Sequence, residues 1–185
     1  MDDLGVLAAD AVGGDPLAAA ALVRATQSDV WRLCAALGDA GTADDLTQET
    51  YLRAFGSLHR FEGRSSLRTW LLAIARRVCA DAVRTRRRRR LTVVRDDAEL
   101  AEVPAPGGTD PVGESAGVAD LLARMDPDRR EAFVLTQLLG LSYAEAAEVA
   151  GCPVGTIRSR VARGRADLVD SLAGVDDDEG DIAHR

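Results

Sequence analysis

The chain has 185 residues, of which 46% are hydrophobic and 29% are charged, and its formal net charge is −7. This length fits one or two domains, and the apolar content excludes a chain that is disordered throughout. No apolar run approaches the roughly 20 residues that span a bilayer, and the start, Met1-Asp2-Asp3, lacks the basic region of a signal peptide. We therefore expect a cytoplasmic protein with no membrane partner.

The sequence before residue 66 predicts two helices and a loop. A proline suits the first turn of a helix over residues 16–37, and Gly38 is a stop signal. A second helix is expected from Thr42, whose side chain can cap it, to Gly56. Two acids lie in its first turn, where the helix dipole favours anions. A loop over residues 57–65 follows.

A third helix has the clearest periodicity, because its apolar residues recur every three or four positions, as one buried face requires. These residues are Leu67, Leu71, Ile74, Val78 and Ala82. The other faces are basic, and residues 58–90 contain eleven arginines against two acids, which gives this block a net charge of +9. A solvated helix surface explains a single arginine, but so many repelling charges require an anionic partner. The block therefore predicts nucleic-acid binding, although the whole chain is acidic.

Residues 91–116 differ in composition from both neighbouring segments. Three prolines, three glycines and many acids, with no sustained apolar period, predict a flexible acidic linker. Strand signals are nearly absent on either side of it. The chain is therefore expected to be all-α, with two small helical modules joined by this linker.

The sequence after the linker predicts a helix-turn-helix. An Asp-Pro pair at 126–127 starts a helix that ends at Gly140. Ser142 and Glu145 form a capping box for a short helix, and a turn at residues 151–153 leads into a new helix. Inward-facing residues are expected at Ala132, Leu135, Leu138 and Leu139 in the first helix and at Val154, Ile157, Val161 and Leu168 in the last.

The outward side of that last helix is rich in hydrogen-bond donors. Four arginines lie within residues 154–165 without a single acid. Such side chains suit phosphates and guanine edges in a DNA major groove. The alternative is a plain helical hairpin with a basic surface.

The cysteines and histidines give no chemical site. Cys34, Cys79 and Cys152 lie far apart, without a CxxC pair and with only two histidines in the chain, so neither a disulfide framework nor a zinc site is expected. We expect all three thiols to be small buried hydrophobes. No catalytic motif is present either, so the prediction is a protein that is not an enzyme, with no cofactor, no metal and no small-molecule substrate.

Two stretches resemble a known family. GLSYAEAAEVAGCPVGTIRSRVARGRADL resembles region 4 of bacterial extracytoplasmic-function (ECF) sigma factors, and DDLTQETYLRAF with RFEGRSSLRTWLLAIARRVCAD resembles their region 2. The two motif sets occur in the same order as in the family, and their sequences are most similar to the actinobacterial sigma-C type. The resemblance implies region 2 in residues 1–90 and region 4 in residues 117–173. Residues 174–185 (GVDDDEGDIAHR) are expected to be a disordered acidic tail.

The resemblance also implies a function in promoter recognition and transcription initiation, typical of stress responses. In region 2, one helix would bind the clamp helices of the largest subunit of core RNA polymerase through Asp44, Asp45, Gln48, Glu49 and Arg53. The −10 element would be bound, with one base flipped out, by Phe61, Glu62, Gly63, Arg64, Ser65, Ser66, Arg68, Trp70, Arg76, Arg77 and Arg84. The −35 element would be bound by Thr156, Arg158, Ser159, Arg160, Arg163 and Arg165. The polymerase flap region and an anti-sigma factor are further candidate partners.

Some alternatives stay open at this point. A stand-alone helix-turn-helix regulator explains residues 117–173 but leaves the block at 42–90 unexplained, and an anti-sigma antagonist does not explain the arginine faces. Trp70 lies near the apolar stripe, so core packing competes with a base contact. Asp81 is expected to form a local ion pair with Arg77, four residues earlier. The linker's acidity fits both mimicry of nucleic acid and a solubilising tether.

Overall fold

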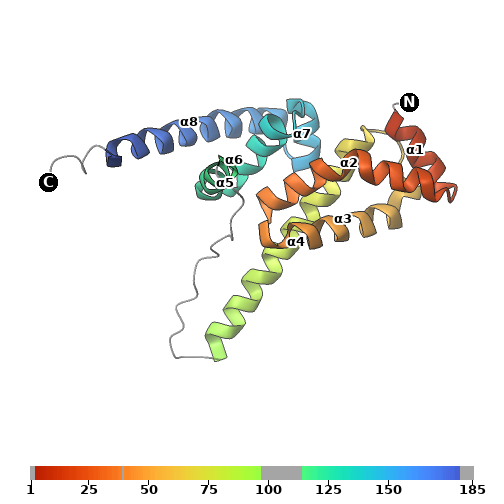
Figure 1. Cartoon of the computed structure of the whole chain (residues 1–185), viewed down its shortest axis with the longest axis horizontal. Helices are drawn as coiled ribbons and strands as arrows, with labels where there is room; N and C mark the ends of the chain where they lie inside the picture. The colour runs from red at the N-terminus through yellow and green to blue at the C-terminus, as the bar shows by residue number, and fades with distance from the viewer. Residues whose placement is uncertain (1–2, 39, 97–113, 180–185) are drawn as a thin grey trace. The chain divides into compact units, whose positions relative to one another are not determined.

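The structure, a computed structural model, describes residues 3–38, 40–96 and 114–179. Over these residues it is helical and contains no strand, which confirms the predicted all-α class. The chain divides into two compact units, Met1–Thr109 and Asp110–Arg185, and each is described by itself below (Figure 1).

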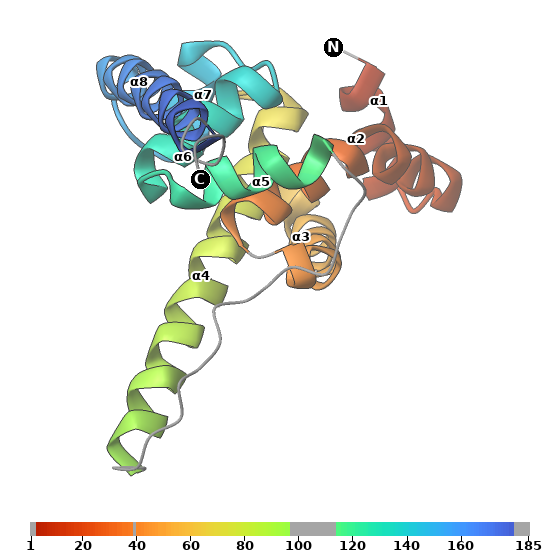
Figure 2. The ribbon, with the colours of Figure 1, turned by 60° about the vertical axis from the view of Figure 1, so that its left-hand side comes forward.

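The described part of the first unit has four α-helices and two short 3-10 turns. They are α1 (Asp3–Val12), α2 (Pro16–Leu37), a turn at Ala40–Thr42, α3 (Ala43–Ser57), a turn at Leu58–Arg60, and α4 (Leu67–Asp96). Helices α2, α3 and α4 pack against one another, and α1 packs along α2 (Figure 2). The sequence predicted α2 and α3 to within about one residue at each end, but it did not predict α1.

The ends of α2 and α3 are formed in different ways. Asp15 caps α2, because its carboxylate accepts a hydrogen bond from the Leu17 amide at 2.8 Å, and Gly38 ends the helix. The prediction that the Thr42 side chain caps α3 is wrong. Thr42 has φ −117° and ψ 4° rather than the extended backbone of a capping residue, because the 3-10 turn leads directly into α3, and its side chain makes no capping hydrogen bond.

The core of the first unit lies where α2 and α4 face each other. Its fully buried side chains include Leu33 and Cys34 of α2 and Leu72 and Val78 of α4. Of the stripe predicted on α4, every residue is buried except Ala82, which is half-buried. Beyond it, α4 extends past α2 and α3 (Figure 1), so its later side chains are exposed as far as Arg89.

Helix α4 also differs from the prediction in length. It continues to Asp96, six residues into the predicted linker, and the next helix begins at Glu114, before the predicted linker ends at residue 116. Residues 91–96 contain no proline or glycine, so no helix-breaking residue ends α4 before Asp96, whereas the prolines and glycines of the predicted linker begin only at Pro104. Residues 97–113 lie outside the described residues, so their flexibility stays a prediction.

The described part of the second unit consists of helices only. They are α5 (Glu114–Arg124), α6 (Pro127–Phe133), a π-helical turn at Val134–Leu138, α7 (Tyr143–Ala150) and α8 (Val154–Glu179). The predicted starts are confirmed: Asp126 accepts from the amides of Asp128 and Arg129, and Ser142 and Glu145 form the capping box. Gly151 ends α7 with φ 66°, a left-handed conformation that glycine adopts without strain.

The π-helical turn changes which side chains face the core. The Leu139 amide bonds to the Val134 carbonyl five residues earlier, so the turn holds one more residue than an α-helical turn. Leu138, predicted to face inward, is consequently 43% exposed, whereas Leu139 is buried. The inward prediction for Val154 is also wrong, because it lies 41% exposed in the first turn of α8.

Helices α6, α7 and α8 form the core of the second unit. Ala132, Leu135, Ile157 and Val161 are completely or almost completely buried, as predicted. Helix α8 runs to Glu179, so six residues of the predicted disordered tail are helical, and residues 180–185 lie outside the described residues. Within the described part of the chain, no helix is long and apolar enough to span a membrane.

Candidate functional site

The start of α3 presents an acidic surface. Asp44, Asp45 and Gln48 are all exposed there, which is a requirement for the partner contact predicted from sequence. Trp31 of α2, itself 42% exposed, donates a hydrogen bond from its indole Nε1 to Asp44 Oδ1 at 2.8 Å. This bond orients one of the predicted contact residues. No local sequence pattern indicates it, because thirteen positions separate the pair.

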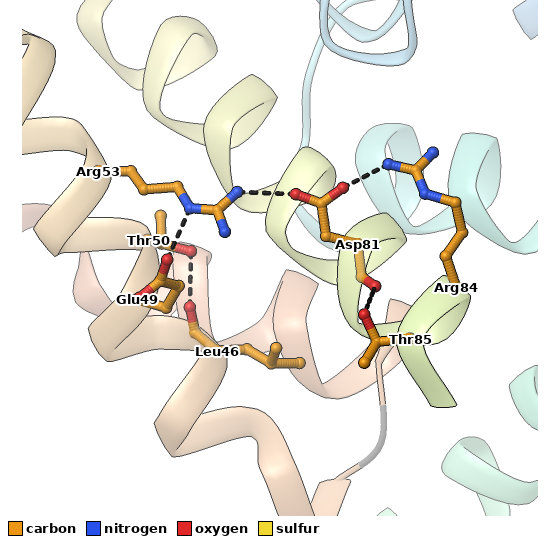
Figure 3. Close-up of polar contacts among 7 residues, drawn as sticks. All are labelled: Leu46, Glu49, Thr50, Arg53, Asp81, Arg84 and Thr85. Atoms are coloured by element: carbon orange, nitrogen blue, oxygen red, sulfur yellow. Dashed lines mark hydrogen bonds and ion pairs between the residues drawn. The ribbon is translucent and has the colours of Figure 1, made fainter. Parts of the chain in front are cut away.

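The second half of α3 is linked to α4 by a chain of charges (Figure 3). Arg53 Nε donates to Glu49 Oε1 at 2.7 Å, and Arg53 Nη1 donates to Asp81 Oδ2 on α4 at 2.8 Å. The other carboxylate oxygen of Asp81 accepts from Arg84 Nη2. Hydrogen bonds from Arg53 and then Arg84 hold the pKa of the Asp81 carboxyl below its ordinary value, and those to Asp81 and Glu49 raise the pKa of Arg53.

The predicted ion pair between Asp81 and Arg77 is wrong. Arg53 lies 28 residues earlier, so helical spacing could not reveal it, and the packing of α3 on α4 brings it to Asp81. Arg84, one turn after Asp81, takes the local position instead of Arg77. Glu49 and Arg53, four residues apart on α3, are the part of this chain of charges that spacing could have predicted.

The loop before α4 contains the predicted base-binding segment. Glu62 and Arg64 form an exposed ion pair at 2.8 Å around Gly63, which has φ 69°. Ser66 ends the loop and caps α4, because its hydroxyl accepts from the Thr69 amide at 3.0 Å.

Phe61 and Trp70 join this loop to the core of the unit. Their ring centroids lie 5.3 Å apart, and both rings are half-buried. They pack against a buried cluster that includes Leu22, Leu58 and Leu67. Core packing, one of the two interpretations of Trp70, is therefore observed for the described chain.

The predicted arginines on α4 differ in exposure. Arg77 and Arg84 are exposed, whereas Arg68 and Arg76 are half-buried. Arg68 Nε donates to Asp29 Oδ2 of α2 at 2.7 Å, a contact that ties the start of α4 to α2. Arginines 86–89 add an exposed basic stretch directly after this face.

The six residues predicted on the last helix all lie in the first half of α8. Arg158, Ser159 and Arg163 are exposed, and Thr156 is half-buried. Arg160 forms an ion pair with Asp128, and Arg165 Nη2 donates to Gln137 Oε1 at 2.8 Å.

The support of this helix comes from residues that sequence reasoning missed. Arg129 of α6 donates twice from Nη1 to the carboxylate of Asp167, at 2.7 and 2.9 Å, and so connects α6 to α8. Asp128 and Gln137, also distant in sequence, hold two of the predicted donors. Gly164 lies where the helices meet, since a Cβ there would be 3.4 Å from the Met125 sulfur.

The thiols follow the prediction in part. Cys34 and Cys79 are buried, but Cys152 is only half-buried because it lies in the turn before α8. A hydrogen bond with Cys79 lowers the pKa of the Cys34 thiol. Among the described residues, no group of three or more histidines, cysteines or acids could hold a metal ion.

Comparison with known families accounts for both units. Residues 22–89 match the family model of sigma-70 region 2, and residues 116–168 match that of sigma-70 region 4. The chain therefore belongs to the sigma-70 family of RNA polymerase sigma factors. A regulator with only a helix-turn-helix would leave residues 22–89 without explanation.

Comparison with individual proteins shows which type of sigma-70 family member the chain resembles. The chain is 56% identical over 162 residues to the ECF RNA polymerase sigma factor SigC of Mycobacterium tuberculosis. The aligned residues cover 86% of this chain and 85% of SigC. The solved structure of CnrH in complex with the cytosolic domain of CnrY has a TM-score of 0.71 and 29% identity, covering 94% of this chain and 99% of CnrH. RpoE of Bartonella quintana, solved with the anti-sigma factor NepR, has a TM-score of 0.65 and 28% identity, covering 82% of this chain and 94% of RpoE. The chain is an ECF-type sigma factor, a transcription initiation factor that acts with core RNA polymerase on promoter DNA.

Proposed function

We propose that residues 1–90 bind core polymerase and the −10 element, that residues 117–173 bind the −35 element, and that the segment between them is a linker. The observation that supports this assignment best is that two surfaces of the first unit have opposite charge. Helix α3 exposes acids and Gln48 at its start, whereas α4 and the loop before it expose arginines. An acidic surface repels DNA and suits a protein partner, and a basic surface attracts phosphate.

The polymerase surface on α3 would consist of five residues. They are Asp44, Asp45, Gln48, Glu49 and Arg53. The bond from Trp31 to Asp44 and the contacts of Arg53 with Glu49 and Asp81 restrict these side chains before the partner binds. Restricting them in advance lowers the entropy lost on association.

The −10 surface would consist of the loop before α4 and the first five turns of that helix. Its residues are Phe61, Glu62, Gly63, Arg64, Ser65, Ser66, Arg68, Trp70, Arg76, Arg77 and Arg84. Pulling a base from the stack costs a few kcal/mol, which contacts in the loop and charge pairing along the strand offset. The packed Phe61 and Trp70 rings give this loop a rigid base.

The −35 surface would be the outward side of the first half of α8. Its residues are Thr156, Arg158, Ser159, Arg160, Arg163 and Arg165. Helix-turn-helix proteins place the start of their second helix in the major groove, where phosphate contacts set the register and contacts to base edges select the sequence.

Three further assignments follow from this function. The chain itself catalyses nothing, because RNA synthesis belongs to the polymerase, and it works in the cytoplasm, where the polymerase meets promoter DNA. An anti-sigma factor is a candidate partner, which the complex of RpoE with NepR supports, since that sigma factor has the same fold.

Run-off transcription tests this proposal. Purified chain and core polymerase are incubated with promoter fragments from the source organism, and transcripts are mapped. We expect initiation at a defined position only when the chain is present, with no other sigma factor added. Transcripts that require a second sigma factor would instead identify a helix-turn-helix regulator.

A further inference from the structure

The basic surface of α4 contains a single acid within residues 67–90, and that acid is Asp81. It lies between Arg53 and Arg84, with one arginine on each carboxylate oxygen (Figure 3). Arg53 belongs to the proposed polymerase surface, and Arg84 belongs to the proposed −10 surface. One carboxylate therefore contacts both surfaces.

The position of Asp81 is fixed by its neighbours. Arg53 is held from two sides, by Glu49 at 2.7 Å and by Asp81 at 2.8 Å, so it anchors the Asp81 carboxylate on the α3 side. The second carboxylate oxygen is thereby directed to Arg84. The lowered pKa of Asp81 agrees with this geometry, because it keeps the carboxylate charged.

We infer that Asp81 limits DNA binding by this sigma factor, because it occupies the guanidinium of Arg84 in the place that a DNA phosphate would take. This inference rests on the proposed function, in which Arg84 contacts DNA. A DNA phosphate must compete with the Asp81 carboxylate for Arg84 Nη2, so the phosphate contact is weaker than it would be without Asp81. Contacts to phosphate carry no sequence information, so Asp81 weakens binding to any duplex and leaves the base contacts to select the promoter. Asp81 is thus a positioning residue that acts through Arg84.

The test is the affinity of the full chain, without polymerase, for a fluorescein-labelled duplex of random sequence. Asp81→Asn keeps the size of the side chain and removes its charge. An exposed ion pair is worth up to about 1 kcal/mol, so we expect the affinity to rise about two- to fivefold at low salt. One further phosphate contact also makes the slope of log K against log salt steeper by about 0.9.

Asp10→Asn is the matched control. Asp10 is an exposed acid on α1 of the same unit, so this variant makes the same change in net charge at a place outside both surfaces. If Asp10→Asn raises the affinity and the salt slope as much as Asp81→Asn does, net charge is responsible and the inference is wrong. Circular dichroism of each variant checks the fold, and Asp81→Ser provides a second variant without the charge.

Arg84→Gln separates this inference from the proposed function. If Arg84→Gln alone leaves DNA affinity unchanged, Arg84 does not contact DNA and its assignment to the −10 surface fails. If Arg84→Gln weakens binding, Asp81→Asn should have no effect in the Arg84→Gln background, as a double-mutant cycle detects. An equal effect of Asp81→Asn with and without Arg84 would overturn the inference while leaving the −10 surface in place.

Discussion

Single arginines on α8 differ in what they must give up before they bind DNA. Arg158 and Arg163 are exposed, and within the described residues neither has an ion pair. To contact DNA, Arg160 must break its ion pair with Asp128, and Arg165 must break its hydrogen bond to Gln137. A side chain that gives up only water contributes more of its hydrogen-bond energy to recognition. Arg158 and Arg163 are therefore stronger candidates for a direct base contact than Arg160 and Arg165. Of the two, Arg158 lies nearer the start of α8, the part of a recognition helix that contacts base edges.

Replacing Arg158 tests this ranking. If its guanidinium contacts a guanine edge, Arg158→Ala should weaken binding of the assembled holoenzyme to the promoter by about 1–3 kcal/mol. Anisotropy titrations with a promoter duplex measure the loss. Arg124→Ala removes an exposed arginine that pairs with Asp120 on α5, outside the −35 surface, and serves as the control. Equal affinities of the two variants would exclude Arg158 from the interface.

The lowered pKa of Asp81 predicts a pH dependence of stability. Its charged form is stabilised by folding, so its contribution is present above the unfolded pKa, about 3.9, and is lost as the pH falls through the lower folded value. The side chain is 44% exposed, so solvent screening keeps the contribution below about 1 kcal/mol. Urea unfolding should show Asp81→Asn less stable than the parent chain at pH 7, and the difference should shrink as the pH falls below about 3.9. A difference that grows as the pH falls would contradict the assignment.

At the scale of helices, features set by neighbours in the sequence could be predicted. The Asp-Pro start of α6, the capping box of α7 and the left-handed Gly151 depend on residues within four positions of one another. The buried stripe of α4 follows from helical periodicity in the same way. Local chemistry therefore predicted the type and order of these helices.

Contacts that arise only from packing could not be predicted. Arg53 meets Asp81, and Arg68 meets Asp29, across 28 and 39 positions, so their partners depend on which helix faces join. The π-helical turn after Phe133 is another example, because one additional residue in a turn changes the register without a sequence signal. For the same reason, the sequence predicted candidate site residues but not the distant residues that form hydrogen bonds and ion pairs with them.

Helix α3 gives a prediction for the polymerase contact. The double change Asp44→Arg and Asp45→Arg should abolish binding of the full chain to core polymerase in a pull-down or anisotropy assay. Charge reversal in the first turn opposes the helix dipole by roughly 0.3–1 kcal/mol for each residue, which is too little to unfold a domain of typical stability.

A matched pair on α1 controls for charge. Asp3→Arg with Asp10→Arg changes the net charge by the same amount, on exposed residues of the same unit, and again places one arginine in a first turn. This variant should bind core polymerase normally. Normal binding by the folded α3 variant would place the polymerase interface on another surface.

At the scale of the whole chain, the uneven distribution of charge affects DNA binding. The overall charge of −7 opposes binding to DNA, while the block at 58–90 carries +9, so the free chain combines attraction at one place with repulsion elsewhere. Each DNA surface is small, and opening a duplex costs energy that one small unit does not supply. Core polymerase would provide the missing contacts and hold both units on one promoter, which raises their effective concentration for each other's sites.

The most direct measurement of sigma-factor action is an anisotropy titration of promoter and scrambled duplexes, with and without core polymerase. The chain alone should bind both duplexes weakly, with little preference and with a steep decrease as salt rises. With core polymerase present, the promoter should be preferred by about a thousandfold or more, as specific complexes are. Tight, promoter-specific binding by the chain alone, unchanged by core polymerase, would contradict a sigma-factor mechanism.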